Sequence, residues 1–107
     1  MVRVLTLTMR TRGSYRQRQR IKRELAAVER VCWLGLEPLN FEQTDRTAGD
    51  FVVIDEELPC AKGGDPLDIN NCHLACNRHN LMKGARILPR GYFARAKPRE
   101  TSTSRRW

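Results

Sequence analysis

The chain has 107 residues, 40% of them hydrophobic and 7% aromatic, and a formal net charge of +8. This length suits one small domain with a limited core, in which a bound metal is a common source of extra stability. The apolar runs are far shorter than the roughly 20 residues that a membrane helix needs, and no signal-peptide pattern is present. We therefore expect a cytoplasmic protein that does not act in a membrane.

Charge alternates in three blocks along the chain. Residues 1–31 carry nine basic and two acidic side chains, residues 32–70 carry two basic and nine acidic, and residues 71–107 carry nine basic and one acidic. Basic flanks suit a polyanion such as nucleic acid, while an acidic centre suits a metal cation. The alternative interpretation is that each run is an ordinary solvated surface.

The first expected element is an amphipathic helix over residues 15–31, and residues 1–13 receive no assignment. Ile21, Leu25 and Val28 recur at helical spacing, with Ser14 as the N-cap. Basic residues crowd the first half of this helix, where positive charge opposes the helix dipole. An external anion such as phosphate explains this arrangement better than intrinsic helix stability does.

A strand, a turn, a second strand and a helix are expected over residues 51–84, after a polar loop at residues 40–50. The β-branched run at residues 51–54 leads directly into carboxylates, beginning with Asp55. The final helix carries His79 and Asn80 and ends at Gly84. The sequence therefore predicts an α+β fold in which a strand-end carboxylate faces a helix across a divalent-metal pocket.

A specific pattern of residues runs through this central segment. The chain carries, in order, Asp55-Glu56, Pro59, Lys62-Gly63-Gly64-Asp65-Pro66, Asn71, Cys76-x-x-His79-Asn80 and Lys83-Gly84. This order and spacing resemble the HNH endonuclease motif in its small phage and bacterial form. The resemblance implies a ββα-metal unit over residues 32–84, with a basic N-terminal segment and helix at residues 1–31 and a basic arm at residues 85–107.

The resemblance implies metal-dependent hydrolysis of DNA phosphodiester bonds. Asp55 and Asn80 would hold a divalent ion such as Mg²⁺, Mn²⁺ or Ni²⁺, and Asn71 would hold the turn in register. Glu56 stands where the family has the histidine that acts as general base. Glu56 could therefore be a base of lower basicity or a second metal ligand, or cleavage could be lost.

The resemblance also implies a structural zinc site, with one departure. Cys32, Cys76 and His79 occupy three of the four ligand positions, and Gly35 occupies the fourth. A closed zinc site needs four ligands. Water or a displaced side chain such as Cys72 could complete the set, or the site could be empty with its residues packed as small hydrophobes.

Double-stranded DNA is the expected partner, and the resemblance points to a phage or bacterial host setting with the phage terminase as a further partner. The expected DNA-contacting residues are Arg16, Arg18, Arg20, Lys22, Arg23, Lys83 and Arg86. The basic segment at residues 85–98 interleaves charges with Tyr92 and Phe93, which either contact nucleic acid or pack on the core. Residues 101–107 are expected to be disordered.

Three function classes follow from the sequence. The leading one is a metal-dependent HNH endonuclease. The second is a DNA-binding protein of the same fold that has lost cleavage, as Glu56 and Gly35 would allow. The third is a zinc-stapled interaction module without nucleic acid, which explains the basic flanks least well.

Overall fold

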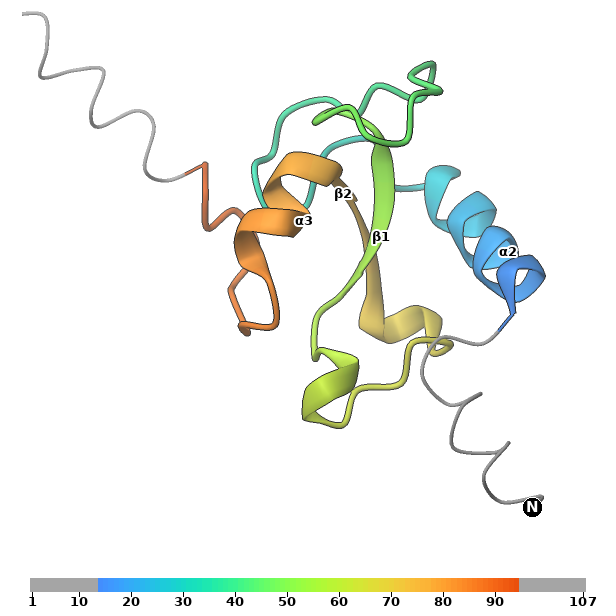
Figure 1. The fold of residues 1–107 in the computed structure, drawn as a ribbon, viewed down its shortest axis with the longest axis vertical. Coiled ribbons are helices and arrows are strands. Elements are labelled where there is room, and N and C mark those ends of the chain that lie inside the picture. The colour runs from blue at the N-terminus through green and yellow to red at the C-terminus, as the bar shows by residue number, and fades with distance from the viewer. Residues whose placement is uncertain (1–13, 95–107) are drawn as a thin grey trace, which may run out of the picture.

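A computed structural model describes residues 14–94 of the chain. The expectations for residues 1–13, for the tail at residues 101–107 and for the end of the basic arm lie outside these residues. The described part is a small α+β fold (Figure 1), with α2 at Tyr15–Ala26, β1 at Val52–Glu56, β2 at Cys72–Cys76 and α3 at Asn77–Lys83. Short 3-10 turns at Cys60–Lys62 and Ile69–Asn71 lie between the strands.

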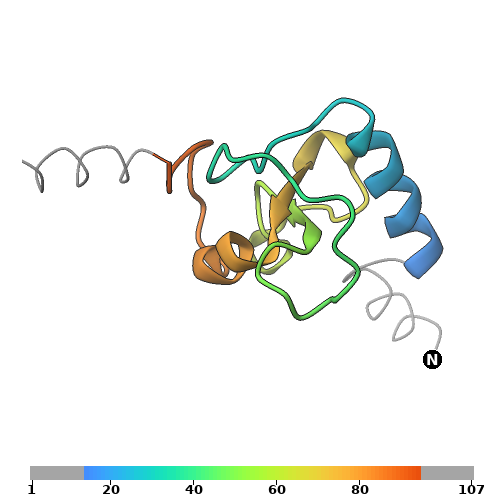
Figure 2. The same cartoon turned by 90° about the horizontal axis from the view of Figure 1, so that it is seen from above.

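The two strands form an antiparallel sheet in which Val52 pairs with Cys76 and Asp55 pairs with His73. The strand, turn, strand and helix order predicted from the sequence is confirmed. The helices α2 and α3 lie on opposite sides of this sheet (Figure 2). β2 runs directly into α3, because Cys76 ends the strand and is also the residue that precedes the first turn of the helix.

The N-terminal helix begins as predicted and ends early. The Ser14 side chain accepts a hydrogen bond from the Gln17 amide at 3.1 Å, and the Gln17 side chain accepts one from the Ser14 amide at 2.9 Å. This reciprocal pair is a capping box and confirms Ser14 as the N-cap. The predicted end near Val31 is wrong, because α2 stops at Ala26 and Val28 is 75% exposed.

Contacts with other parts of the fold follow the end of α2. The Glu29 carboxylate accepts a hydrogen bond from the Leu74 amide of β2 at 2.7 Å. Val31 then pairs with Pro38 in an isolated β-bridge, so the chain here is tied to other segments and not to a longer helix. Helical spacing in the sequence does not reveal a contact made to a strand 45 residues away.

One hydrophobic core joins all three predicted segments. Ile21 and Leu25 of α2 pack with Leu34 from the loop, Leu74 from β2 and Leu88 from the segment after α3. The remaining buried apolar residues of this core are Cys32, Trp33, Leu39, Val52, Cys72, Ala75 and Cys76. The described parts of the three charge blocks therefore share one core.

The C-terminal arm packs back on the core over its described length. The Gly91 amide donates to the Trp33 carbonyl at 2.8 Å, and the Phe93 amide donates to the Leu34 carbonyl at 3.0 Å. Phe93 is partly buried against the core, whereas Tyr92 stays 40% exposed. The packing alternative is confirmed for Phe93.

The core makes a direct prediction about stability. Leu74→Ala should lower the free energy of unfolding by about 2–5 kcal/mol, because its side chain is fully buried and its removal leaves a cavity. Leu81→Ala, at a position that is 72% exposed on α3, should change it by no more than about 0.5 kcal/mol. Urea unfolding of both variants measures the difference, and equal effects would contradict the assigned core.

Candidate functional site

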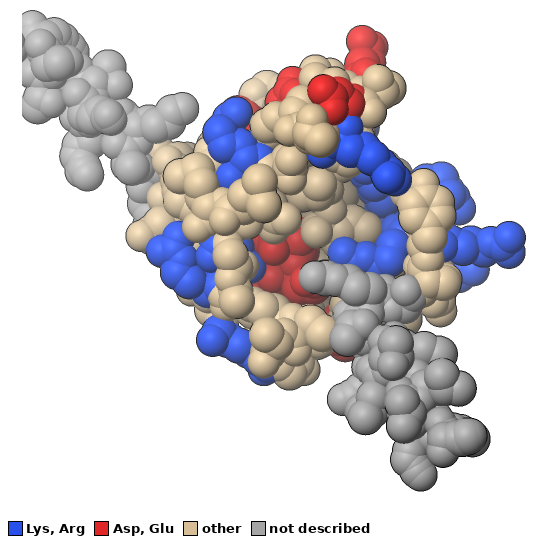
Figure 3. Space-filling view, viewed as in Figure 1, with Lys and Arg blue, Asp and Glu red and all other residues tan. Residues whose placement is uncertain are grey.

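Acidic and basic side chains converge in a cavity of about 490 Å³ where β1 ends beside α3. The residues that matter here, named the carboxylate pocket, are Arg18, Asp55, Glu56, Asn80 and Lys83. Figure 3 shows acidic atoms recessed in a hollow of this face, with basic side chains on both sides. Three of the four residues to which the resemblance gives catalytic roles therefore line one cavity, and Asn71 lies outside it.

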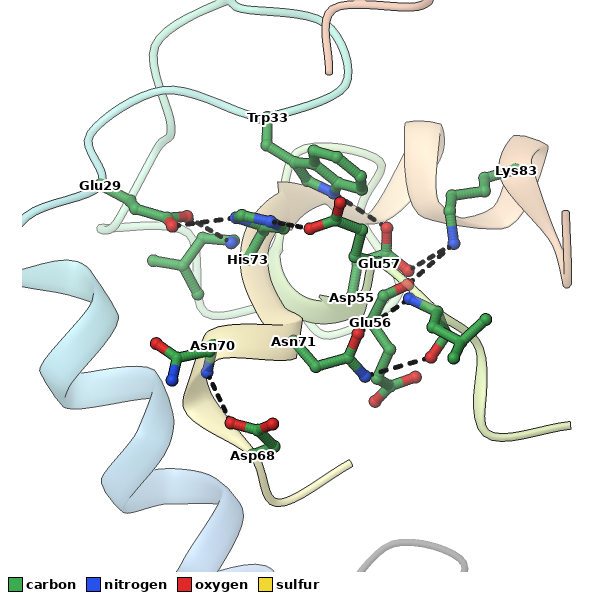
Figure 4. Close-up of polar contacts among 12 residues, drawn as sticks. Glu29, Trp33, Asp55, Glu56, Glu57, Asp68, Asn70, Asn71, His73 and Lys83 are labelled. Atoms are coloured by element: carbon green, nitrogen blue, oxygen red, sulfur yellow. Dashed lines mark hydrogen bonds and ion pairs between the residues drawn. The ribbon is translucent and has the colours of Figure 1, made fainter. Parts of the chain in front are cut away.

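Asp55 is the centre of this pocket and is only 5% exposed. Its two carboxylate oxygens accept hydrogen bonds from Trp33 Nε1 at 2.9 Å and from Lys83 Nζ at 3.2 Å (Figure 4). Burial raises the pKa of Asp55, while the Trp33 hydrogen bond and the Lys83 charge act in the opposite direction. The carboxylate of Asp55, which was expected to bind a metal, is thus already paired with the Lys83 ammonium group.

Lys83 was expected on the DNA-binding surface, and this placement is wrong. Its side chain is 1% exposed, and Nζ also donates to the Glu56 carbonyl at 3.1 Å. The last turn of α3 faces the end of the sheet, so the amine is directed inward. The sequence around Lys83 does not indicate that its side chain is buried, because the carboxylate that it neutralises belongs to β1.

Arg18 was also expected to contact DNA, but its side chain makes hydrogen bonds within the protein. Its guanidinium donates to Glu56 Oε2 at 3.0 Å and to the Pro66 carbonyl at 2.8 Å. These bonds tie α2 to the end of β1 and to the turn that leads into β2. Both side chains are largely buried, at 17% exposed for Arg18 and 9% for Glu56.

Of the other expected DNA contacts, Lys22 and Arg86 interact with other groups of the protein, and three arginines of α2 are exposed. Lys22 Nζ lies 4.6 Å from the centroid of the Phe51 ring, and burial lowers the pKa of Lys22, with a smaller effect from Arg46. Arg86 is exposed, although its guanidinium donates to carbonyls in the last turn of α3. The exposed basic residues of α2 are Arg16, Arg20 and Arg23.

Asn71 makes the contacts expected of it. Its side-chain oxygen accepts from the Leu58 amide at 2.9 Å, and its side-chain nitrogen donates to the Leu58 carbonyl at 3.1 Å and to the Asp65 carbonyl at 3.2 Å. The Asn71 carbonyl also accepts from the Glu57 amide at 2.8 Å. One side chain therefore fastens both ends of the long turn that joins β1 to β2, and the predicted hydrogen bonding is confirmed.

His73 lies beside the pocket and was missed by the sequence reasoning. It pairs with Asp55 in the sheet register, and its ring stacks on Trp33 with centroids 4.4 Å apart. Its Nδ1 lies 3.2 Å from Glu29 Oε2, and its Nε2 lies 3.1 Å from Glu57 Oε1. Only the strand register could have pointed to His73, because its partners Glu29 and Glu57 lie 44 and 16 residues earlier in the chain.

A second cluster, named the thiol cluster, lies where β2 meets α3. It consists of Cys32, Glu37, Cys76 and His79, whose potential ligand atoms all lie within 4.8 Å of one another. These four residues could hold a metal ion. The structure thus brings together the three expected ligands and adds Glu37, which the sequence reasoning missed.

Cys72 is not part of the thiol cluster. It is buried in the core, its thiol donates to the Pro66 carbonyl at 3.6 Å, and burial raises its pKa to about 11. The suggestion that Cys72 supplies a fourth ligand is therefore wrong. Cys72 is the thiol nearest to Cys76 in sequence, but four residues of an extended strand span about 13 Å, so the two thiols do not meet at one ion.

The two thiols of the cluster differ in protonation. A hydrogen bond from the Cys76 thiol lowers the pKa of Cys32 to about 5, and backbone amides of Cys76 and Gly35 add to this effect. The same bond and burial raise the pKa of Cys76. The pKa values of the two thiols therefore shift in opposite directions.

Comparison with family models, curated proteins and solved structures finds no match to this chain. Among the described residues, none of the helices is both long and apolar enough to cross a membrane.

The Asn71 contacts predict a position-specific loss of stability. Asn71→Ala should lower the free energy of unfolding by about 1–3 kcal/mol, because it leaves the Leu58 amide and carbonyl without their partner. Asn70→Ala, at the exposed neighbouring position, is the matched control and should change it by no more than about 0.5 kcal/mol. Similar losses in urea unfolding would show that Asn71 is an ordinary turn residue.

The buried pair of Asp55 and Lys83 predicts non-additive effects. Lys83→Met should destabilise the fold by about 3–5 kcal/mol, because it leaves a buried carboxylate without its counter-charge. Adding Asp55→Asn should recover part of that loss, since no unpaired charge then remains. Urea unfolding of the two single variants and the double variant measures the coupling, and simple additivity would contradict it.

Proposed function

We propose that this chain is a metal-dependent HNH endonuclease that hydrolyses phosphodiester bonds in double-stranded DNA. The observation that carries the proposal is the convergence of Asp55 and Glu56 from β1 with Asn80 from α3 on one cavity. The turn fastened by Asn71 lies next to them. Because Asp55, Glu56 and Asn80 line one cavity, their positions support a shared catalytic role.

The donor atoms of the carboxylate pocket suit a hard divalent cation such as Mg²⁺, Mn²⁺ or Ni²⁺. Asp55 offers carboxylate oxygens and Asn80 offers an amide oxygen, which are the ligand types that such cations prefer. When bound, the ion would supply Lewis-acid stabilisation of the phosphate and of the departing oxygen. Lys83 would have to release Asp55 Oδ1 for this ion to bind, because two cations at one carboxylate oxygen repel each other.

Glu56 occupies the position of the family's general base. Its Oε2 atom is held at 3.0 Å by Arg18, which orients the carboxylate from α2. In a nuclease, Glu56 would accept a proton from the attacking water or bind the metal. Arg18 also donates to the Pro66 carbonyl at 2.8 Å, so a metal bound by Glu56 would have to compete with an ion pair that the turn before β2 helps to hold in place.

The exposed face of α2 supports the DNA-binding part of the proposal. Arg16, Arg20 and Arg23 follow one another at spacings of four and three residues, so they form one stripe along the helix. Such a stripe contacts phosphates without reading bases. The setting that we propose is the cytoplasm of a bacterial host, with the phage terminase as the further partner that the resemblance implies.

A second candidate is a DNA-binding protein of the same fold without cleavage. The two buried ion pairs favour it, since Lys83 balances Asp55 and Arg18 balances Glu56. A pocket with balanced charges attracts a divalent cation less than one with two unpaired carboxylates does. The same DNA-contacting stripe would then serve binding alone.

Supercoiled-plasmid cleavage with Mg²⁺, Mn²⁺, Ni²⁺ or EDTA distinguishes the two candidates. A nuclease should nick the plasmid with at least one of these metals and not with EDTA, and Asp55→Ala should abolish nicking. Glu56→Gln should lower the rate without weakening DNA binding, and Glu56→His should raise it near neutral pH because imidazole is the stronger base there. Cleavage only by Glu56→His would identify the parent as the non-cleaving relative.

DNA affinity should fall steeply as salt rises. Arg16→Gln combined with Arg20→Gln should reduce the slope of log affinity against log salt by about two, since each lost phosphate contact removes about 0.9. Lys62→Gln combined with Arg90→Gln removes the same number of exposed charges outside α2 and should leave the slope nearly unchanged. Fluorescence anisotropy with duplexes of two unrelated sequences measures this, and a change confined to one sequence would contradict phosphate contact.

A further inference from the structure

Several separations in the thiol cluster are close to those of a tetrahedral ligand set, and all its ligand atoms lie within 4.8 Å of one another. His79 Nδ1 lies 3.6 Å from Cys32 Sγ, 3.3 Å from Cys76 Sγ and 3.4 Å from Glu37 Oε2. Cys76 Sγ lies 3.1 Å from Glu37 Oε2. Zinc bonds of about 2.3 Å to sulfur and about 2.0–2.1 Å to nitrogen or oxygen place tetrahedral neighbours about 3.3–3.8 Å apart.

The absence of a side chain at Gly35 makes room for the fourth ligand. A Cβ atom built on Gly35 would overlap with the Glu37 carboxylate and with the imidazole ring of His79. Gly35 therefore leaves space beside the loop that the Glu37 carboxylate and the His79 ring occupy. This overlap also means that Gly35→Cys would displace Glu37 and His79, so that substitution is not a simple restoration of a missing ligand.

Backbone amides already support a thiolate in this cluster. The amides of Gly35 and Cys76 both donate to Cys32 Sγ, each at 3.4 Å. Such donors stabilise the negative charge that a metal-bound sulfur carries. The loop around Cys32 is held tightly as well, since the Leu36 amide donates to the Cys32 carbonyl at 2.7 Å.

We propose that Cys32, Glu37, Cys76 and His79 form a closed, four-coordinate zinc site in which Glu37 supplies the ligand that Gly35 cannot. Two thiolates, one imidazole and one carboxylate complete the tetrahedron, and any proton held by the two thiols passes to solvent when zinc binds. The site is structural, because all four positions are taken by the protein.

This zinc site goes beyond the proposed function and does not depend on it. It ties the loop at residues 32–37 to the junction of β2 and α3, and thereby fixes the start of the helix that carries Asn80 and Lys83. The ring of Phe93 stacks on His79 with centroids 5.0 Å apart, so it covers one face of the imidazole. A protein that binds DNA without cleaving it would need this structural zinc site as much as a nuclease would.

The test measures metal directly in the full-length protein. Purified protein should contain one zinc per chain, and X-ray absorption at the zinc edge should show two sulfur and two nitrogen or oxygen neighbours. Replacement with Co²⁺ should give the intense visible bands of a tetrahedral ion with thiolate ligands. Protein without zinc whose melting temperature is unchanged by a chelator would overturn the site.

Variants identify the fourth ligand. Glu37→Gln should weaken zinc binding by at least about tenfold in competition with a chromophoric chelator, since a neutral amide replaces an anionic ligand. Glu42→Gln, at an exposed position in the neighbouring loop, is the matched control and should bind zinc as the parent does. Glu37 is partly exposed, so Glu37→Gln should fold, and unchanged zinc affinity in this variant would remove Glu37 from the ligand set.

Discussion

The buried carboxylate of Asp55 is the interaction on which the arrangement of the whole fold depends. A carboxylate in an apolar interior is costly unless its oxygens are paired, and here the partners come from two different segments. Trp33 reaches it from the loop before β1, and Lys83 reaches it from the last turn of α3. If either partner moved away, one oxygen of this buried carboxylate would lose a hydrogen bond, so the loop, the strand and the helix hold one another in place.

The second anchor of α3 lies at its other end. Its seven residues are far too few for a helix that is stable by itself, so it needs tertiary contacts at both ends. His79 belongs to the thiol cluster in the first turn, and Lys83, four residues later, belongs to the carboxylate pocket. Asn80 lies between these two anchors and is therefore presented by a helix whose position is set by polar contacts more than by apolar packing.

Sequence reasoning succeeded where the signal was local and failed where the partner was distant. The Ser14 cap, the strand that leads into Asp55 and the Gly84 stop all depend on residues close in sequence, whereas the Asn71 contacts were expected only from the family resemblance. Gly84 has φ of +61°, a conformation that glycine adopts readily, and this makes it a dependable end signal. The roles of Arg18, Lys83 and Glu37 were missed because each is defined by a partner 38, 28 or 39 residues away.

The same ion pairs that stabilise the pocket also oppose the chemistry proposed for it. In the described structure Asp55 and Glu56 are balanced by Lys83 and Arg18, which favours folding and disfavours a divalent cation. Lys83 is 1% exposed, so a phosphate of bound DNA would not reach its ammonium group while the fold is intact. A divalent cation at Asp55 would therefore have to displace Lys83 itself, and the free energy of breaking this ion pair would subtract from the affinity for the metal. A nuclease built on this pocket would bind its metal more weakly than one whose carboxylate has no ammonium partner.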